Sequence, residues 1–214
     1  MKIIGPDYLV FGVDDVDACV QYLTDYGLKP RDVDEAGGYL EALDGTGILI
    51  RRRDDPRLPA AMETASTLRE TVYGVADEAT LQAIEAELSK DRSVTRGEDG
   101  VLRTVDDLGF ALGFQISCRR PLDLPGEISN APGARASRPL NSLGASEEMP
   151  ALPRSLSHVV YFVPDHARGE AFYARLGFVC TDRFIDVGPF LRPAGTEDHH
   201  TLFLIQTPPF MKGI

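Results

Sequence analysis

The sequence predicts an α+β protein built from tandem βαβββ modules. Residues 8–28 are repeated as residues 158–178, and a further copy begins near residue 73. Each copy changes at the same point from a strand-like pattern to a helix-like pattern. The composition, with 43% hydrophobic and 26% charged residues, is that of an ordinary globular protein. Copies of this kind indicate one supersecondary unit that is used several times.

The alignment of the copies pairs residues of the same chemical kind. At a shift of 150 residues, the aligned pairs are Val10 with Val160, Val13 with Val163, Asp15 with Asp165, Tyr22 with Phe172 and Gly27 with Gly177. At a shift of 62 residues, the segment 73–77 matches the segment 11–15, although the end of its helix is less alike.

Each copy opens with a strand and a helix start. Residues 159–163 read VVYFV, and β-branched and aromatic residues of this kind favour a strand. An aspartate follows in every copy, and its side-chain oxygen can cap the first turn of a helix. These aspartates are Asp15, Asp77 and Asp165.

An amphipathic helix comes next in each copy, because apolar residues recur at helical spacing. These residues are Val16, Cys19, Val20 and Leu23 in the first copy, Leu81, Ile84 and Leu88 in the second, and Ala167, Ala171, Phe172 and Leu176 in the third. Gly27 and Gly177 stand where a helix ends in the left-handed conformation, which glycine adopts at least cost.

Three short strands are expected after each helix. In the first copy they are residues 28–33, 38–42 and 47–52, and in the third copy they are residues 178–185, 189–192 and 201–206. The domains expected from this pattern are an N-terminal pair of modules over 1–118 (6–55 and 68–118), an arm over 119–154 and a third module over 155–214. Six prolines in the arm exclude a regular helix or sheet there.

Charge and apolar patterning exclude several partners. The net charge of -11 would repel a nucleic-acid backbone. No apolar run approaches the ~20 residues of a membrane span, and no signal peptide is recognisable. The odd set of Cys19, Cys118 and Cys180 predicts reduced, mostly buried thiols in a cytoplasmic protein.

Two histidine motifs carry a resemblance to a known superfamily. Residues 158–165 read HVVYFVPD, and residues 198–203 read DHHTLF. Tandem βαβββ modules with histidines at these places resemble the vicinal oxygen chelate superfamily, which includes glyoxalase I, fosfomycin and bleomycin resistance proteins and type I extradiol dioxygenases. The chain looks most like the two-domain dioxygenases, over residues 6–118 and 155–207. Those proteins have four modules, and their C-terminal pair holds the metal.

The resemblance implies a metal site in the third module. His158 stands at the position of the first metal ligand, and the ion would be Fe(II), with Mn(II) as the alternative. His199 and His200 stand where extradiol members have an acid/base that moves protons and where glyoxalase-like members have a metal ligand. A strand alternates its faces, so only one of this pair can point into the cup, and we favour His200.

The chain also departs from the superfamily pattern. Tyr8 and Glu70 stand where His158 stands, so we expect the N-terminal pair to be structural. No Asp or Glu follows His200, which leaves the facial triad incomplete, and a fourth module would begin about where the sequence stops. We therefore expect residues 156–207 to form a half-cup, with His158 facing its open side.

The resemblance implies an extradiol-type dioxygenase that cleaves a catechol-like diol with O2 when a fourth module completes the site. We expect a small aromatic substrate, no nucleic-acid or membrane partner, and a homo-oligomer. Two alternatives stay open. One is a glyoxalase-like isomerase or lyase that acts through an enediolate, and the other is a non-catalytic protein that binds a small ligand.

Overall fold

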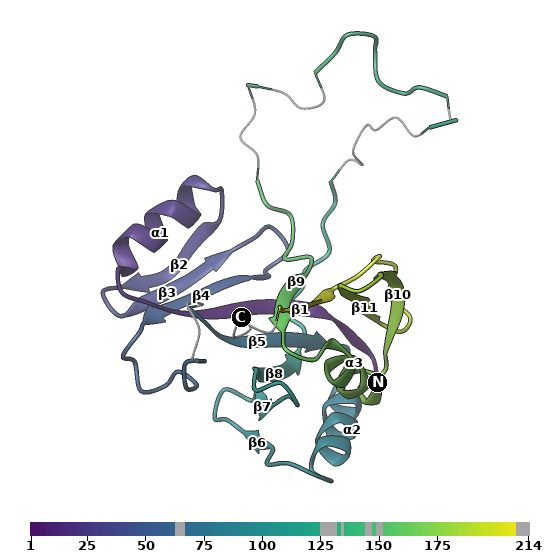
Figure 1. Ribbon diagram of the computed structural model, residues 1–214. Coiled ribbons are helices and arrows are strands. Elements are labelled where there is room, and N and C mark those ends of the chain that lie inside the picture. The colour runs from purple at the N-terminus through teal and green to yellow at the C-terminus, as the bar shows by residue number, and fades with distance from the viewer. Residues whose placement is uncertain (63–66, 125–131, 134, 144–146, 149–151, 209–214) are drawn as a thin grey trace.

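The chain forms three consecutive βαβββ units, as the repeat predicts (Figure 1). The computed structural model describes residues 1–62, 67–124, 132–133, 135–143, 147–148 and 152–208. No helix or strand occurs among the described residues between 117 and 158, which agrees with an arm rich in proline.

The bounds of the elements lie within a residue or two of the expected strands. The first unit comprises β1 (Ile3–Val13), α1 (Val16–Asp25), β2 (Lys29–Asp34), β3 (Gly37–Glu41) and β4 (Gly47–Arg52). The second comprises β5 (Leu68–Val75), α2 (Glu78–Leu88), β6 (Thr95–Arg96), β7 (Leu102–Val105) and β8 (Ala111–Ile116). The third comprises β9 (Val159–Val163), α3 (His166–Arg175), β10 (Phe178–Phe184), β11 (Gly188–Pro193) and β12 (Leu202–Gln206).

The helix starts follow the predicted capping chemistry. The carboxylate of Asp15 accepts a hydrogen bond from the Ala18 backbone N–H at 2.9 Å, and Asp77 and Asp165 cap α2 and α3 in the same way. Gly27 and Gly177 end α1 and α3 at φ values of 105° and 87°. The C-caps Tyr26 of α1 and Ser89 of α2 are both right-handed, but Lys90 follows Ser89 where Gly27 follows Tyr26, and Lys90 has no positive φ, so this helix end is less alike.

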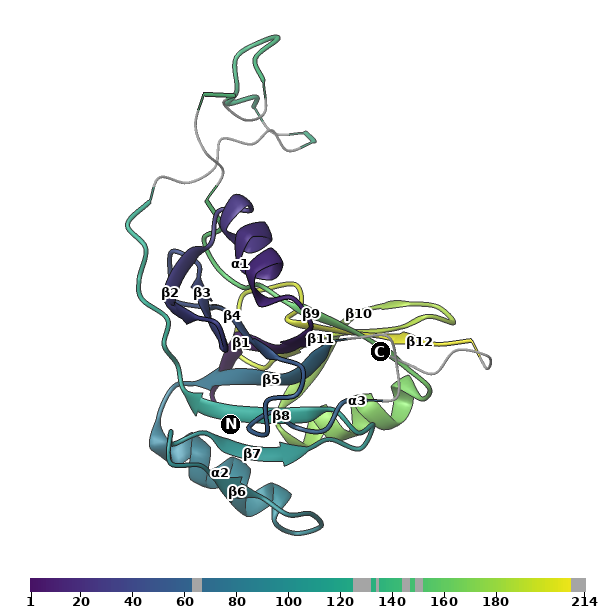
Figure 2. The same ribbon diagram turned by 90° about the vertical axis from the view of Figure 1, so that its left-hand side faces the viewer.

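The strands form two sheets. The first two units share an eight-stranded sheet in the order β2-β3-β4-β1-β5-β8-β7-β6, in which β1 and β5 join the units as antiparallel neighbours. The third unit has its own four-stranded sheet in the order β10-β11-β12-β9. Figure 2 shows this smaller sheet beside the larger one. The tandem-module fold, in which the third unit has a sheet of its own, is therefore confirmed.

The second and third units share one hydrophobic core. Tyr73 on β5 packs against Phe178 with ring centroids 5.7 Å apart, and Phe110 stacks on Tyr161 at 4.1 Å. Helices α2 and α3 are joined by an ion pair of 3.0 Å between Glu87 and Arg175. One face of the third sheet is thereby buried against the N-terminal units.

The opposite face of the third sheet is open. On β9, Val159, Tyr161 and Val163 are buried, whereas Val160 is exposed, as strand alternation requires. No strand among the described residues pairs with the outer edge of β9. The third unit thus has one buried face and an unpaired edge among the described residues, and that it forms half of a cup stays a prediction.

The prediction of mostly buried cysteines is wrong. All three thiols are free, but Cys118 and Cys180 are exposed and Cys19 is only half-buried. Cys118 lies just after β8, and Cys180 lies at an irregular point of the edge strand β10, so neither reaches the core. Among the described residues, no helix is long and apolar enough to cross a bilayer.

Candidate functional site

Two parallel strands bring the histidine motifs together. His158 directly precedes β9, and His199 and His200 lie three and two positions before the first residue of β12. Strands β9 and β12 are parallel neighbours, with Val159 opposite Leu202, so both motifs lie at the same end of the third sheet. The distance of about forty residues between the motifs is closed by the βαβββ topology alone.

His158 and His200 are neighbours in this arrangement. Their ring centroids are 4.7 Å apart. The Ser157 hydroxyl lies 3.0 Å from His158 Nδ1, and a hydrogen bond there leaves Nε2 of His158 free to contact a ligand. His158 is exposed and His200 is half-buried, so both remain accessible on the open face.

His199 has a different environment. Its Nδ1 lies 2.9 Å from Nδ1 of His200, and its Nε2 lies 3.6 Å from the Asp182 carboxylate on β10. The His200 ring therefore lies beside that of His158, whereas Nε2 of His199 points toward the exposed carboxylate of Asp182.

The surroundings favour a neutral His200. Burial is the largest cause that lowers the pKa of His200, and the neighbouring imidazoles of His158 and His199 lower it further. The carboxylate of Asp198 raises this pKa, but by less. A neutral imidazole is the form that accepts a proton or binds a metal.

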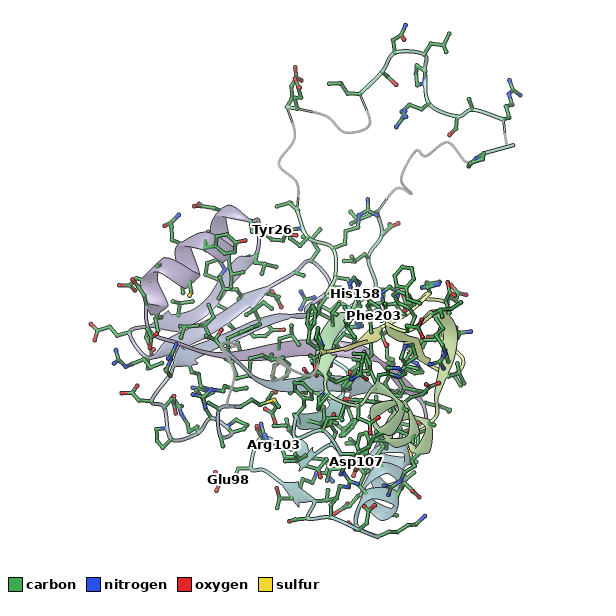
Figure 3. The ribbon with its side chains drawn as sticks, in the orientation of Figure 1. Tyr26, Glu98, Arg103, Asp107, His158 and Phe203 are labelled. Atoms are coloured by element: carbon green, nitrogen blue, oxygen red, sulfur yellow. The ribbon has the colours of Figure 1, made fainter. Side chains whose placement is uncertain are left out.

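An aromatic floor, defined as Phe184, Phe190 and Phe203, adjoins the histidines. Phe190 stacks on Phe203 at 3.9 Å, and the Phe190 ring centroid lies 4.8 Å from that of His200. Phe184 completes the floor at 5.3 Å from Phe190. The sequence reasoning missed these residues because their common face depends on the pairing of Phe190 with Phe203 across β11 and β12. Figure 3 shows His158 and Phe203 over the third unit.

The donors fit only part of a metal site. His158 and His200 supply two imidazoles, which suit the nitrogen ligands of Fe(II), Mn(II) or Zn(II). The described residues contain no group of three His, Cys, Asp or Glu that could hold a metal ion. A complete site would need at least one further ligand from a segment outside them.

In the N-terminal units, the positions that match His158 are occupied by Tyr8 and Glu70 instead of histidine. Tyr8 and Glu70 lie near each other across β1 and β5, where Val10 is opposite Glu70. Glu70 is buried and paired with Arg103 at 3.0 Å. That these units hold no metal stays a prediction.

Comparisons with known proteins agree on the fold. No protein-family model matches the chain. A stretch of 84 residues is 34% identical to metapyrocatechase 2 of Cupriavidus necator, and it covers 39% of this chain and 25% of that protein.

Two solved structures superimpose on nearly the whole chain. The Mn(II)-bound glyoxalase of Novosphingobium aromaticivorans gives a TM-score of 0.65 at 21% identity, over 97% of this chain and 63% of that one. The 2,3-dioxygenase LapB of Pseudomonas sp. KL28 gives 0.66 at 18% identity, over 97% and 72%. The chain thus spans less than two thirds of that glyoxalase. Its fold is that of the glyoxalases and extradiol dioxygenases, the vicinal oxygen chelate fold.

Proposed function

We propose that the chain is an extradiol-type dioxygenase, or the greater part of one, whose third unit forms half of a catechol-binding cup. The observation that carries the proposal is the pairing of His158 with His200 beside the aromatic floor on an open sheet face. The likeness to a metapyrocatechase and to a 2,3-dioxygenase supports the same class of reaction.

Each residue has a role in the proposal. His158 would bind the metal through Nε2, while Ser157 holds its Nδ1. The neutral imidazole of His200 would accept a proton from a diol hydroxyl and return it to the product. The aromatic floor would contact the flat face of the ring, since aromatic rings pack well at the distances seen between Phe190 and Phe203. A bound Fe(II) would supply the chelation of both hydroxyls and the site for O2.

The test is oxygen uptake with a panel of catechols after anaerobic loading with Fe(II), using protein that carries any further C-terminal segment needed to complete the ligand set. The proposal expects uptake and a yellow ring-fission product, both lost in His158→Gln. His166→Gln is the matched control, because His166 lies at the start of α3 and outside the histidine cluster. Absence of uptake with every catechol would overturn the dioxygenase proposal.

The distance between His158 and His200 also supports a second candidate. Rings 4.7 Å apart can both ligate one ion, which is the arrangement expected of a glyoxalase-like isomerase or lyase. That reaction needs no O2 and would be supported by Ni(II), Co(II) or Zn(II). Activity that persists under argon with these metals would favour it over the dioxygenase.

A further inference from the structure

A second cavity lies on the N-terminal units, away from the histidine cluster. It is an open cavity of about 380 Å³, lined by Pro59, Glu70, Arg92, Ser93, Thr95, Arg103, Thr104, Val105 and Ala111. This volume falls within the usual range of small-molecule sites, which is about 300–1,000 Å³. Figure 3 shows Arg103 in the second unit, well apart from the labelled His158.

Glu70 gives the cavity a largely buried carboxylate. The residue is 4% exposed, and its Oε1 accepts a hydrogen bond from Arg103 Nε at 3.0 Å. Its Oε2 is not among the fully buried polar atoms that lack a partner in the described part of the chain, so this oxygen is open to the cavity that Glu70 lines. Burial is the largest influence on Glu70 and raises its pKa, with Arg103 opposing. A carboxylate in such a largely buried setting favours a hydrogen-bond donor or a cation as its ligand.

The two arginines that line the cavity, Arg92 and Arg103, already form ion pairs with carboxylates of the protein. Both Nη atoms of Arg103 donate to Asp99, at 2.9 and 2.6 Å, so the group of Glu70, Arg103 and Asp99 keeps one net negative charge. Arg92 is likewise bound to Asp91 at 2.9 Å and to Asp107 at 2.6 Å. An anionic ligand would find no unmatched cation among these residues.

Tyr8 offers a further polar group beside Glu70. The register of β1 and β5 sets Val10 opposite Glu70, so Tyr8 lies diagonally across from it on the same face. Burial and then the charge of Glu70 raise the pKa of the Tyr8 phenol, which reflects the closeness of the two groups. The Tyr8 ring meets Tyr39 edge-on at 6.0 Å, and Tyr8 itself lies outside the cavity lining.

We propose that this cavity binds a small organic monocation, a primary amine on a compact apolar body. The ammonium group would donate to Glu70 Oε2, and the body would contact Val105, Ala111 and Pro59. The site is separate from the histidine cluster, so it holds or fails independently of the proposed dioxygenase activity.

The test uses the full chain and three probes of similar shape: benzylamine, benzyl alcohol and benzoate. Calorimetry and amide NMR shifts should show saturable binding of benzylamine, with benzyl alcohol at least tenfold weaker and benzoate not bound. Glu70→Gln keeps an acceptor for Arg103 and should weaken benzylamine at least tenfold. Glu98→Gln removes the same charge from an exposed position and should leave binding unchanged.

A second variant covers the case in which Glu70→Gln does not fold. Val105 lines the cavity and is 49% exposed, so Val105→Phe fills the space without burying a new charge, and it should also weaken benzylamine at least tenfold. Equal binding of benzylamine and benzyl alcohol, no binding of benzylamine, or wild-type affinity in a folded variant of either kind would overturn the proposal.

Discussion

Asp106 is a buried carboxylate whose surroundings make the stability of the protein depend on pH. Its side chain is almost fully buried at the contact between the second and third units, where it accepts hydrogen bonds from Leu108 N, Phe110 N and the Tyr173 hydroxyl. Burial outweighs these bonds and raises the pKa of Asp106 to about 6 from its ordinary 3.8. Tyr173 comes from α3, so this carboxylate links two units that are far apart in sequence.

The shift predicts a loss of stability as pH rises. The folded state holds the Asp106 proton more tightly than the unfolded state. The contribution of this proton to the free energy of unfolding is therefore complete below about pH 4, decreases between about pH 4 and pH 6, and is lost at higher pH. The fall should be about 3 kcal/mol, from 1.36 kcal/mol per pKa unit. Denaturant unfolding of wild type and Asp106→Asn measures it, because the neutral variant lacks this titration. A difference in unfolding free energy that does not change with pH would contradict the prediction.

At the scale of the residue, the sequence predicted the roles of some side chains and not of others. The capping aspartates were predicted because capping is local, within three residues of the helix start. His158, His199 and His200 were selected through the resemblance, and their roles remain predictions. The Asp106–Tyr173 contact was not predicted, since the partners are 67 positions apart and a buried carboxylate has no local sequence signature.

At the scale of the element, two glycines begin equivalent strands. Gly37 starts β3 and Gly188 starts β11, with φ values of 141° and 154°. A Cβ on Gly188 would collide with the backbone carbonyl of Leu204, and one on Gly37 would collide with that of Ile50. The glycines therefore permit close approach of neighbouring strands within each unit.

Gly188→Ala should destabilise the protein by about 3 kcal/mol, because both the backbone conformation and the collision must be relieved. Gly195→Ala is the matched control: its φ is also positive, at 90°, but no heavy atom lies within 4 Å of the added Cβ. That variant should lose only about 1 kcal/mol. Urea unfolding of both variants makes the comparison, and equal losses would show that strand contact is not the cause.

The order of elements was predictable, and their pairing was not. Alternation, helical spacing and turn glycines are local signals, so the βαβββ units and most strand bounds were obtained from the sequence. The joining of β1 to β5, and the packing of the third unit on the second, depend on long-range contacts such as Phe110 with Tyr161. The aromatic floor depends on the same kind of pairing. The division into domains and the oligomeric state stay predictions.

For the whole molecule, the shared core predicts that the second and third units unfold together. Phe110 is 5% exposed and stacks on Tyr161. Phe110→Ala should cost about 4 kcal/mol and keep a single unfolding transition. Phe184→Ala is the control, because Phe184 is 58% exposed, and it should change stability by about 0.5 kcal/mol or less. Unfolding of the third unit in a separate transition from the second in wild type would contradict a common core.

The central claim is that the open face of the third unit forms half of a metal and substrate site around His158 and His200. The chain has four histidines, so their ring resonances can be followed individually by NMR. On titration with Mn(II), the signals of His158 and His200 should broaden first, that of His199 next, and that of His166 last, and His158→Gln should abolish the early broadening. Broadening of His166 as early as His158, or no selective broadening, would contradict the claim.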